Sequence, residues 1–228
     1  MTAYPAAPWD LRGRVAVVPV PVRASAARDA GLPPGARLLT AGAWTLGGLL
    51  LADYDESATL RYRELIVFSA LALVCGRPAL VVSHIYVDLD ASLAGGRAIW
   101  GLPKELASFT ARDGRVDARA ADGRGLATIA VRRRARRARL PLWAGVIGTL
   151  GGVAARTATT GSLRASLAAA QVEVPAESPF AALGLDGRHT ALAGDRLALP
   201  FPPPHGPDPG AMRASGFDPD VSAFAPAG

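Results

Sequence analysis

Lysine is almost absent from this chain of 228 residues. Lys and Arg together number 25, and Lys104 is the single lysine, so the other 24 basic residues are arginines. Arginine can replace lysine as a surface cation, but its guanidinium stays protonated near neutral pH and is no nucleophile. An amine that must lose its proton and attack a carbonyl carbon has to be a lysine. Lys104 is therefore the first candidate for a chemical role, with chance survival as the alternative.

Cysteine, histidine and long apolar runs are also scarce. The single cysteine, Cys75, excludes a disulfide within the chain, and its apolar neighbours predict a buried, unreactive thiol. His84, His189 and His205 lack the spacing of metal ligands, so no metal site is expected. No apolar run reaches the ~18 residues of a membrane helix, and the N-terminus lacks a signal-peptide pattern. These absences predict a soluble cytoplasmic protein without a membrane partner.

The charge that is present is mainly arginine, and the formal net charge is +6. Half of the residues are hydrophobic, which is typical of a globular chain. We expect one domain over residues 1–201, followed by a tail rich in Pro, Gly and Ala over residues 202–228. The arginine-rich run at 132–139 has no interleaved aromatic residues. It is interpreted as a solvated strand end or a contact between subunits, with no nucleic acid as a partner.

Short β-branched and apolar segments, separated by turn residues, dominate the chain. We expect strands at 14–22, 37–52, 60–75, 79–89, 106–111, 115–120, 126–132 and 197–201, and a strand pair over 157–174 turned at Gly161. Helices are expected at 24–30 and 91–100, whereas 140–155 is interpreted as buried or loop-like. The pattern has no βαβ rhythm, so it predicts a mainly β fold, an antiparallel barrel or sandwich.

The segment around Lys104 links a helix to a strand. Asp88 or Asp90 is expected to cap the helix, and Gly101 to end it. The neighbours of Lys104 are apolar or small, and burial among them disfavours the ammonium form and favours a Schiff-base-forming amine. Adjacent strand residues point to opposite faces, so an inward Lys104 sends Glu105 outward. A surface lysine paired with Glu105 remains the alternative.

Four motifs carry a family resemblance. Gly96-Arg97-x-x-Trp100-Gly101-x-Pro103-Lys104 resembles the signature of the acetoacetate decarboxylase superfamily. Pro8-Trp9-x-Leu11-x-Gly13-Arg14 is similar to the opening of that family, and Tyr62-x-Glu64 resembles its Tyr-x-Glu strand motif. Tyr86-x-Asp88-x-Asp90 stands where the family has a short segment before its helix. The resemblance extends over roughly residues 4–110.

This resemblance implies a homo-oligomeric, β-barrel-like protein in which Lys104 is the Schiff-base nucleophile, without a cofactor or metal. It implies Glu64 as a carboxylate that moves protons, and Arg14 as a clamp for the carboxylate of a substrate. Trp100 is the expected binding residue beside the lysine. Two positions depart from the decarboxylase: Glu105 replaces a second lysine, and Gly47-Gly48-Leu49 replaces a further glutamate.

The sequence thus predicts a lyase of the decarboxylase type acting on a small β-keto acid such as acetoacetate. One alternative is an aldolase–dehydratase or cyclase that uses the same lysine. Another is a member that binds a carbonyl ligand without catalysis, and a third is a protein that binds an anionic polymer through its arginine run. Two other residues receive structural roles: Arg97 is expected to pair with Asp88 or Glu105, and His84 to pack within a strand.

Overall fold

A computed structural model describes residues 2–133 and 138–204. These residues form eleven strands, two α-helices and one 3-10 helix. In chain order they are β1 (Trp9–Arg23), α1 (Ala24–Asp29), β2 (Arg37–Leu38), β3 (Trp44–Tyr54), β4 (Arg63–Val74), β5 (Arg77–Val87), α2 (Asp90–Trp100), β6 (Lys104–Arg112), β7 (Arg115–Ala120), β8 (Gly125–Arg133), β9 (Ala138–Leu150), β10 (Val153–Glu173), η1 (Ala181–Leu183) and β11 (Gly187–Phe201).

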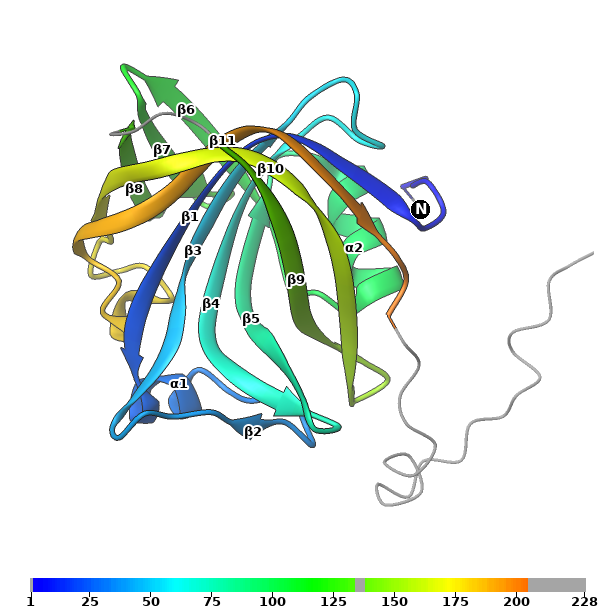
Figure 1. Cartoon of the computed structure of the whole chain (residues 1–228), viewed down its shortest axis with the longest axis vertical. Helices are drawn as coiled ribbons and strands as arrows, with labels where there is room; N and C mark the ends of the chain where they lie inside the picture. Colours follow the sequence, from blue (N-terminus) through cyan, green and yellow to red (C-terminus); the bar gives the residue numbers. More distant parts are fainter. Residues whose placement is uncertain (1, 134–137, 205–228) are drawn as a thin grey trace, which may run out of the picture.

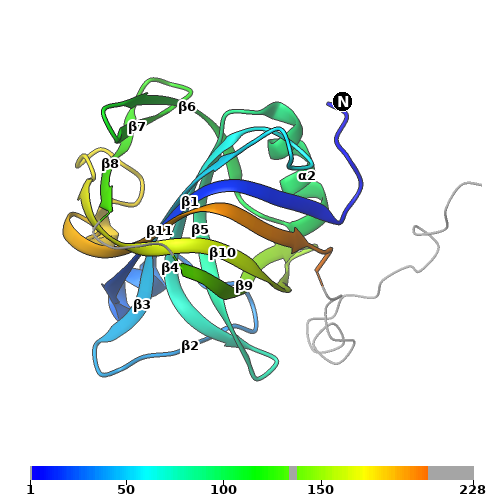
Figure 2. The ribbon, with the colours of Figure 1, turned by 45° about the horizontal axis from the view of Figure 1, so that its top comes forward.

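The strands form a single sheet that joins back onto itself. Their order is β2-β4-β3-β1-β11-β10-β8-β7-β6-β5-β9, and β4 also pairs with β5 and β10 with β9. Two closed circuits share β10, β11, β1, β3, β4 and β5; β9 completes one circuit and β6, β7 and β8 complete the other. Figures 1 and 2 show β6, β7 and β8 on one side of the molecule and α2 on the other.

Most of the described strand pairs are antiparallel, and the parallel ones are β5 with β6 and β5 with β9. The predicted mainly β, mainly antiparallel fold is confirmed. The strands expected at 60–75 and 79–89 are β4 and β5, those expected at 115–120 and 126–132 are β7 and β8, and the first expected helix is α1. Each of the two strand pairs is antiparallel and forms a hairpin.

Side chains along β4 point alternately into two different apolar regions of the molecule. Leu65 and Val67 are fully buried in the larger hydrophobic core, whereas Glu64, Ile66 and Phe68 line a cavity. Successive strand residues point to opposite faces, so one strand contributes to both regions. The cavity therefore lies on the opposite face of β4 from the core.

Helix α2 ends as predicted but begins differently. Gly101 adopts a left-handed conformation with φ 61° and ψ 28°, the usual backbone of a helix-ending glycine. The prediction that Asp88 or Asp90 caps the helix is wrong, because the N-cap is Leu89 and no side chain caps it. Asp88 Oδ1 instead accepts a hydrogen bond of 2.7 Å from the backbone N–H of Arg63. Asp88 thus holds the start of β4.

Three other sequence interpretations are wrong. Cys75 is exposed, because it lies in the turn between β4 and β5 with a positive φ of 51°. Residues 140–155 belong to β9 and β10, and Gly161 lies inside the continuous β10, paired with Leu142. A Cβ atom at Gly161 would collide with the carbonyl oxygen of Ala198. This glycine marks a close backbone approach and not a turn.

The expected strand at 37–52 is divided into β2 and β3, and the expected short strand at 197–201 is the end of the longer β11. The backbones of β3 and β1 approach each other closely at Gly48. Gly48 has φ 136°, and a Cβ atom there would collide with the carbonyl oxygen of Val18.

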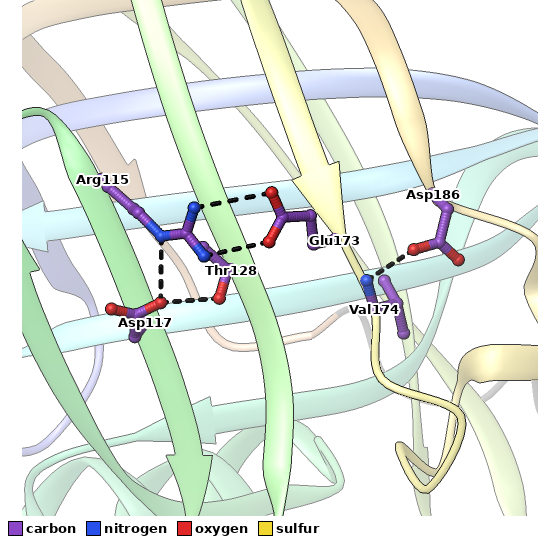
Figure 3. A network of polar contacts seen from close by, with 6 residues as sticks. All are labelled: Arg115, Asp117, Thr128, Glu173, Val174 and Asp186. Carbon is purple, nitrogen blue, oxygen red and sulfur yellow. Dashed lines mark hydrogen bonds and ion pairs between the residues drawn. The ribbon is translucent and has the colours of Figure 1, made fainter.

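A polar network connects β7, β8 and β10 on the surface (Figure 3). Arg115 donates to both carboxylate oxygens of Glu173, at 3.5 and 2.9 Å, and its Nε lies 3.4 Å from Asp117 Oδ1. Thr128 donates to Asp117 at 2.6 Å, and nearby the backbone N–H of Val174 donates to Asp186 at 2.6 Å. The ion pairs are exposed, so solvent screens them and they add little stability.

Part of the predicted features lies outside the described residues. These features are the centre of the arginine run, 134–137, and residues 205–228 of the expected tail. Arg132 and Arg139, which flank the undescribed part of the run, are exposed. Within the described residues, neither α-helix has the length and apolar character required to cross a membrane.

Candidate active site

The side chain of Lys104 points into the cavity from the first residue of β6. It is 3% exposed, and its Nζ lies 2.8 Å from Glu64 Oε1 and donates to Ser92 Oγ at 2.8 Å. Glu105, the next residue, is exposed. The predicted inward lysine and outward glutamate are confirmed, and the alternative of a surface lysine paired with Glu105 is excluded.

The backbone around Lys104 is held by its neighbours in the motif. Arg97 Nε donates to the carbonyl oxygen of Lys104 at 2.7 Å, and Lys104 is in register with Ile85 of β5. The expectation that Arg97 pairs with Asp88 or Glu105 is not met, since its guanidinium binds this backbone oxygen. Arg97 thereby fixes the start of β6, from which the lysine projects.

Small residues on α2 make room for the lysine. Ser92, Gly95 and Gly96 are the buried residues of this helix besides Trp100. A Cβ atom at Gly96 would collide with Cδ and Cε of Lys104, and one at Gly95 would lie 2.6 Å from the Trp9 ring. Ser92 lies outside the predicted motif, although its place one helical turn before Gly96 puts it on the same helix face.

Two buried tyrosines complete the polar end of the cavity. The Tyr54 hydroxyl donates to Glu64 Oε2 at 2.9 Å, and the Tyr62 ring centroid lies 5.0 Å from Lys104 Nζ. Burial, and next the charge of Glu64, raise the pKa of Tyr54 and the pKa of Tyr62 well above the usual tyrosine value. Tyr62 belongs to the Tyr-x-Glu motif, whereas nothing in the sequence analysis marked Tyr54.

The cavity has a volume of about 200 Å³ and is bounded by strands of the circuit that β9 completes. Lys104 and Glu64 are the charged side chains among the described residues that line it, and Tyr54 and Tyr62 are beside them. The rest of the wall is almost entirely apolar. It includes Leu11, Val15, Val17, Leu50, Ile66, Phe68, Leu80, Val82, Ile85, Leu142, Ala144, Val146, Leu163, Leu197 and Leu199.

Trp100 lines this cavity next to the lysine. It is 2% exposed, and its ring meets that of Trp9 edge-on at 4.7 Å between centroids. Its indole N–H donates to the carbonyl oxygen of Pro202 at 2.7 Å. Trp100 is thus a rigid apolar wall whose polar atom is already bonded within the protein.

Arg14 does not join the other predicted site residues, and its expected role as a carboxylate clamp is corrected here. Its guanidinium lies 3.1 Å from Asp53 Oδ2, and the side chain is 71% exposed. On β1, Val15 and Val17 line the cavity, so alternation turns Arg14 to the other face. The structure brings together Lys104, Glu64 and Trp100, but not Arg14.

The described part of the chain contains no group of three or more His, Cys, Asp or Glu side chains placed to hold a metal ion. His84 is half-buried beside Phe180, with 5.6 Å between ring centroids, and burial lowers the pKa of His84. This is the packed strand histidine that the sequence predicted.

Comparison with known proteins decides the family. The family model described as acetoacetate decarboxylase (ADC) matches residues 2–143. The chain belongs to the acetoacetate decarboxylase family. Among solved structures, acetoacetate decarboxylase from Legionella pneumophila has a TM-score of 0.60 at 18% identity, with 90% of each chain covered. The enduracididine biosynthesis enzyme MppR complexed with pyruvate has a TM-score of 0.62 at 17% identity, covering 90% of this chain and 91% of its own.

At these identities the two structures support the family fold alone. The curated relatives that match by sequence are the proteins named NEOXANTHIN-DEFICIENT 1. The rice protein is 33% identical over 103 residues, 45% of this chain and 34% of its own length, and the tomato protein is 32% identical over 107 residues, 47% and 36%. The chain thus spans about a third of the length of these curated relatives.

Proposed function

We propose that this chain is a Schiff-base-forming lyase, in which the Lys104 amine reacts with the carbonyl carbon of a small molecule. The observation that carries the proposal is the burial of Lys104 Nζ in an apolar cavity, 2.8 Å from the Glu64 carboxylate. A buried amine with a proton acceptor at hydrogen-bond distance has the parts that nucleophilic catalysis by lysine needs.

Glu64 supplies the proton transfers. Its carboxylate accepts a proton from the Lys104 ammonium, which leaves a neutral amine to attack the carbonyl carbon. The carboxylic acid of Glu64 then protonates the hydroxyl of the carbinolamine, which departs as water and leaves an iminium. Tyr54 donates to the other oxygen of the same carboxylate and keeps it oriented toward the lysine. Ser92 Oγ accepts a hydrogen bond from Lys104 Nζ and so helps to hold the lysine nitrogen in place.

Decarboxylation of a β-keto acid such as acetoacetate is the first reaction in this proposal. The bond between the α-carbon and the carboxylate breaks, carbon dioxide leaves, and the electron pair moves into the iminium to form an enamine. Glu64, which has given its first proton to the departing water, takes up another proton from solvent and delivers it to the enamine carbon. Water then hydrolyses the iminium, which releases the ketone and regenerates the amine of Lys104. No cofactor takes part in this sequence.

A second candidate is aldol-type chemistry, and the composition of the cavity favours it. No arginine is among the described residues that line the cavity, so the carboxylate that decarboxylation requires would find no guanidinium partner, whereas an aldol donor such as acetone needs no carboxylate. In this reaction the Glu64 carboxylate removes a proton from the carbon next to the iminium. The resulting enamine attacks the carbonyl carbon of an aldehyde, and the alkoxide that forms takes the proton from Glu64. The product can then lose water, and hydrolysis of the iminium releases it from Lys104.

The proposal has three further parts, of which the first rests on the family resemblance and the other two rest on the composition and segment pattern of the sequence. They are a homo-oligomeric assembly, a cytoplasmic location, and one catalytic domain over residues 1–201. They do not depend on which bond breaks after the iminium forms.

Borohydride trapping tests the proposal. The protein is incubated with acetoacetate, or with pyruvate, in the presence of borohydride, and its intact mass is measured. We expect a stable adduct on Lys104, the single lysine, and no adduct in Lys104→Arg. Release of carbon dioxide from acetoacetate, or condensation of pyruvate with an added aldehyde, separates the two reactions. Binding of these compounds without any adduct would contradict the proposal and favour a non-catalytic ligand binder.

A further inference from the structure

The polarity of the cavity wall beyond Lys104 limits which ligands the cavity can bind. Apart from the Lys104–Glu64 pair, the described lining side chains carry no charge. The charges of that pair cancel, so the cavity offers no net charge to a ligand. Burying a charged group against the apolar wall, without a partner, would cost free energy. The part of a ligand that lies beyond the reacting carbonyl must therefore be apolar.

The size of the cavity excludes a tight fit to a very small ligand. An apolar cavity of about 150 Å³ in another protein holds benzene. The present cavity, at about 200 Å³, is larger. The apolar substituent on the ketone carbon of acetoacetate is a methyl group, beside its carboxymethyl group, so acetoacetate would leave most of this apolar wall without contacts.

The residues that line the cavity also extend along β5. Ile85, which is in register with Lys104, and Leu80 both line it, and they are five residues apart on this strand. The register of β5 shifts between these two residues, so they are separated by less than the about 16 Å that five residues of a regular strand span. Leu80 is paired with Val146 of β9, and Ala144 lies two residues before Val146 on the same wall. The apolar space therefore extends from the amine of Lys104 toward these residues.

We propose that the cavity selects carbonyl compounds with an uncharged apolar substituent of about the size of a six-carbon group. The ketone carbon would lie at Lys104 Nζ, and the substituent would extend along β5 toward Leu80 and Ala144. This inference rests on the Schiff-base function proposed above. It adds the substrate class to that function: ketones, or β-keto acids, with a medium-length aliphatic or aromatic chain.

A chain-length series tests the inference. Borohydride trapping is measured over a range of concentrations of acetone and 2-octanone, and of acetoacetate and 3-oxooctanoate. We expect the half-saturating concentration to fall about fourfold for each methylene that becomes buried. The longer member of each pair should thus be trapped at a concentration at least about tenfold lower.

A substitution at the far end of the cavity provides the matched test. Ala144→Phe puts a ring into the space assigned to the substituent and leaves Lys104 and Glu64 unchanged. We expect it to remove most of the preference for 2-octanone over acetone, while acetone is still trapped. Ala169→Phe is the control, since Ala169 is a half-buried strand residue outside the cavity. It should keep the wild-type preference.

The outcomes separate this inference from the proposed function. Equal half-saturating concentrations within both pairs, with adducts on Lys104, would overturn the apolar selection and leave the Schiff-base function in place. An unchanged preference in Ala144→Phe would also overturn it, because the substituent would then lie elsewhere. Absence of an adduct with all four compounds would overturn the proposed function and the inference together.

Discussion

Lys104 and Glu64 form an ion pair in which both side chains are almost fully buried. Such a pair adds little net stability relative to apolar residues, because both charges must be removed from water. Removing one partner is costly, since the other charge then stays buried without compensation. The hydrogen bonds that Lys104 donates to Ser92 and that Glu64 accepts from Tyr54 are further contacts that keep the pair in place. This site is therefore maintained by several residues at once.

The coupling within this pair can be measured. Lys104→Met should lower the free energy of unfolding by about 3–5 kcal/mol, because it leaves the Glu64 carboxylate unpaired. The double variant Lys104→Met/Glu64→Gln should lose less than the sum of its two single variants, as measured by urea unfolding. Glu105→Gln, at an exposed neighbour, should stay within about 0.5 kcal/mol of the wild type. Additive effects of the two single variants would contradict a coupled pair.

Tyr54 is the residue that orients Glu64. Tyr54→Phe removes the donor to Glu64 Oε2 and leaves that oxygen buried without this bond. We expect a loss of about 1–3 kcal/mol in the free energy of unfolding, and slower adduct formation in the trapping assay. Tyr4→Phe is the matched control, because Tyr4 is 40% exposed. Equal effects of the two variants would show that the Tyr54 hydroxyl has no special role.

At the scale of the elements, α2 and β6 form the site together. Gly96→Ala should favour the isolated helix, since glycine is less favourable than alanine by about 0.8–1 kcal/mol in a helix interior. Its Cβ atom, however, would occupy the space of Lys104 Cδ and Cε and displace the amine from Glu64. We expect trapping with acetoacetate to slow by at least about tenfold, as for misplaced reacting groups. Ala98→Ser, on the exposed side of the helix, should leave the trapping rate unchanged.

Much of the element pattern follows from local physical rules, and the failures have local reasons too. The alternation of side chains along a strand predicted the inward Lys104 and the outward Glu105. The preference of glycine for the left-handed conformation at helix ends predicted the end of α2 at Gly101. Cys75 was placed inside because its neighbours are apolar, but the run ends in a turn at this residue. Gly161 was interpreted as a turn, because a sequence does not tell a turn from a close approach between strands.

The pairing of strands in the folded protein determines which candidate residues lie close together. The sequence grouped Lys104, Glu64, Trp100 and Arg14 through family motifs, and the first three lie at one cavity. The position of Arg14 depends on the face of β1 that turns toward the cavity. That face is set by pairing with β3 and β11, which no segment of the sequence reveals by itself.

At the scale of the whole molecule, closure of the sheet buries three tyrosines. Burial raises the pKa of Tyr86 to about 12, and raises the pKa values of Tyr54 and Tyr62 well above the usual value. The unfolded chain releases these protons near pH 10, before the folded protein does. The stability contribution of the protonated tyrosines is therefore complete below about pH 10 and is lost as the pH rises above it.

Alkaline unfolding measures this effect. Between about pH 10 and 12 the free energy of unfolding should fall by up to about 1.4 kcal/mol per pH unit for each buried tyrosine. Tyr86→Phe should reduce this slope by about a third, whereas Tyr4→Phe, at an exposed position, is the control. Urea unfolding at a series of pH values gives the slope. A slope that is the same in the wild type and in Tyr86→Phe would contradict the prediction.

The division of β4 between core and cavity has a consequence for divergence within a family. Substitutions at Ile66 or Phe68 change the walls that a ligand meets, whereas substitutions at Leu65 or Val67 change the packing of the core. Selection for a new ligand and selection for a stable protein thus act on alternate positions of the same strand. New ligand preferences can then arise in this fold while the residues that keep it folded, and the reactive lysine itself, stay the same.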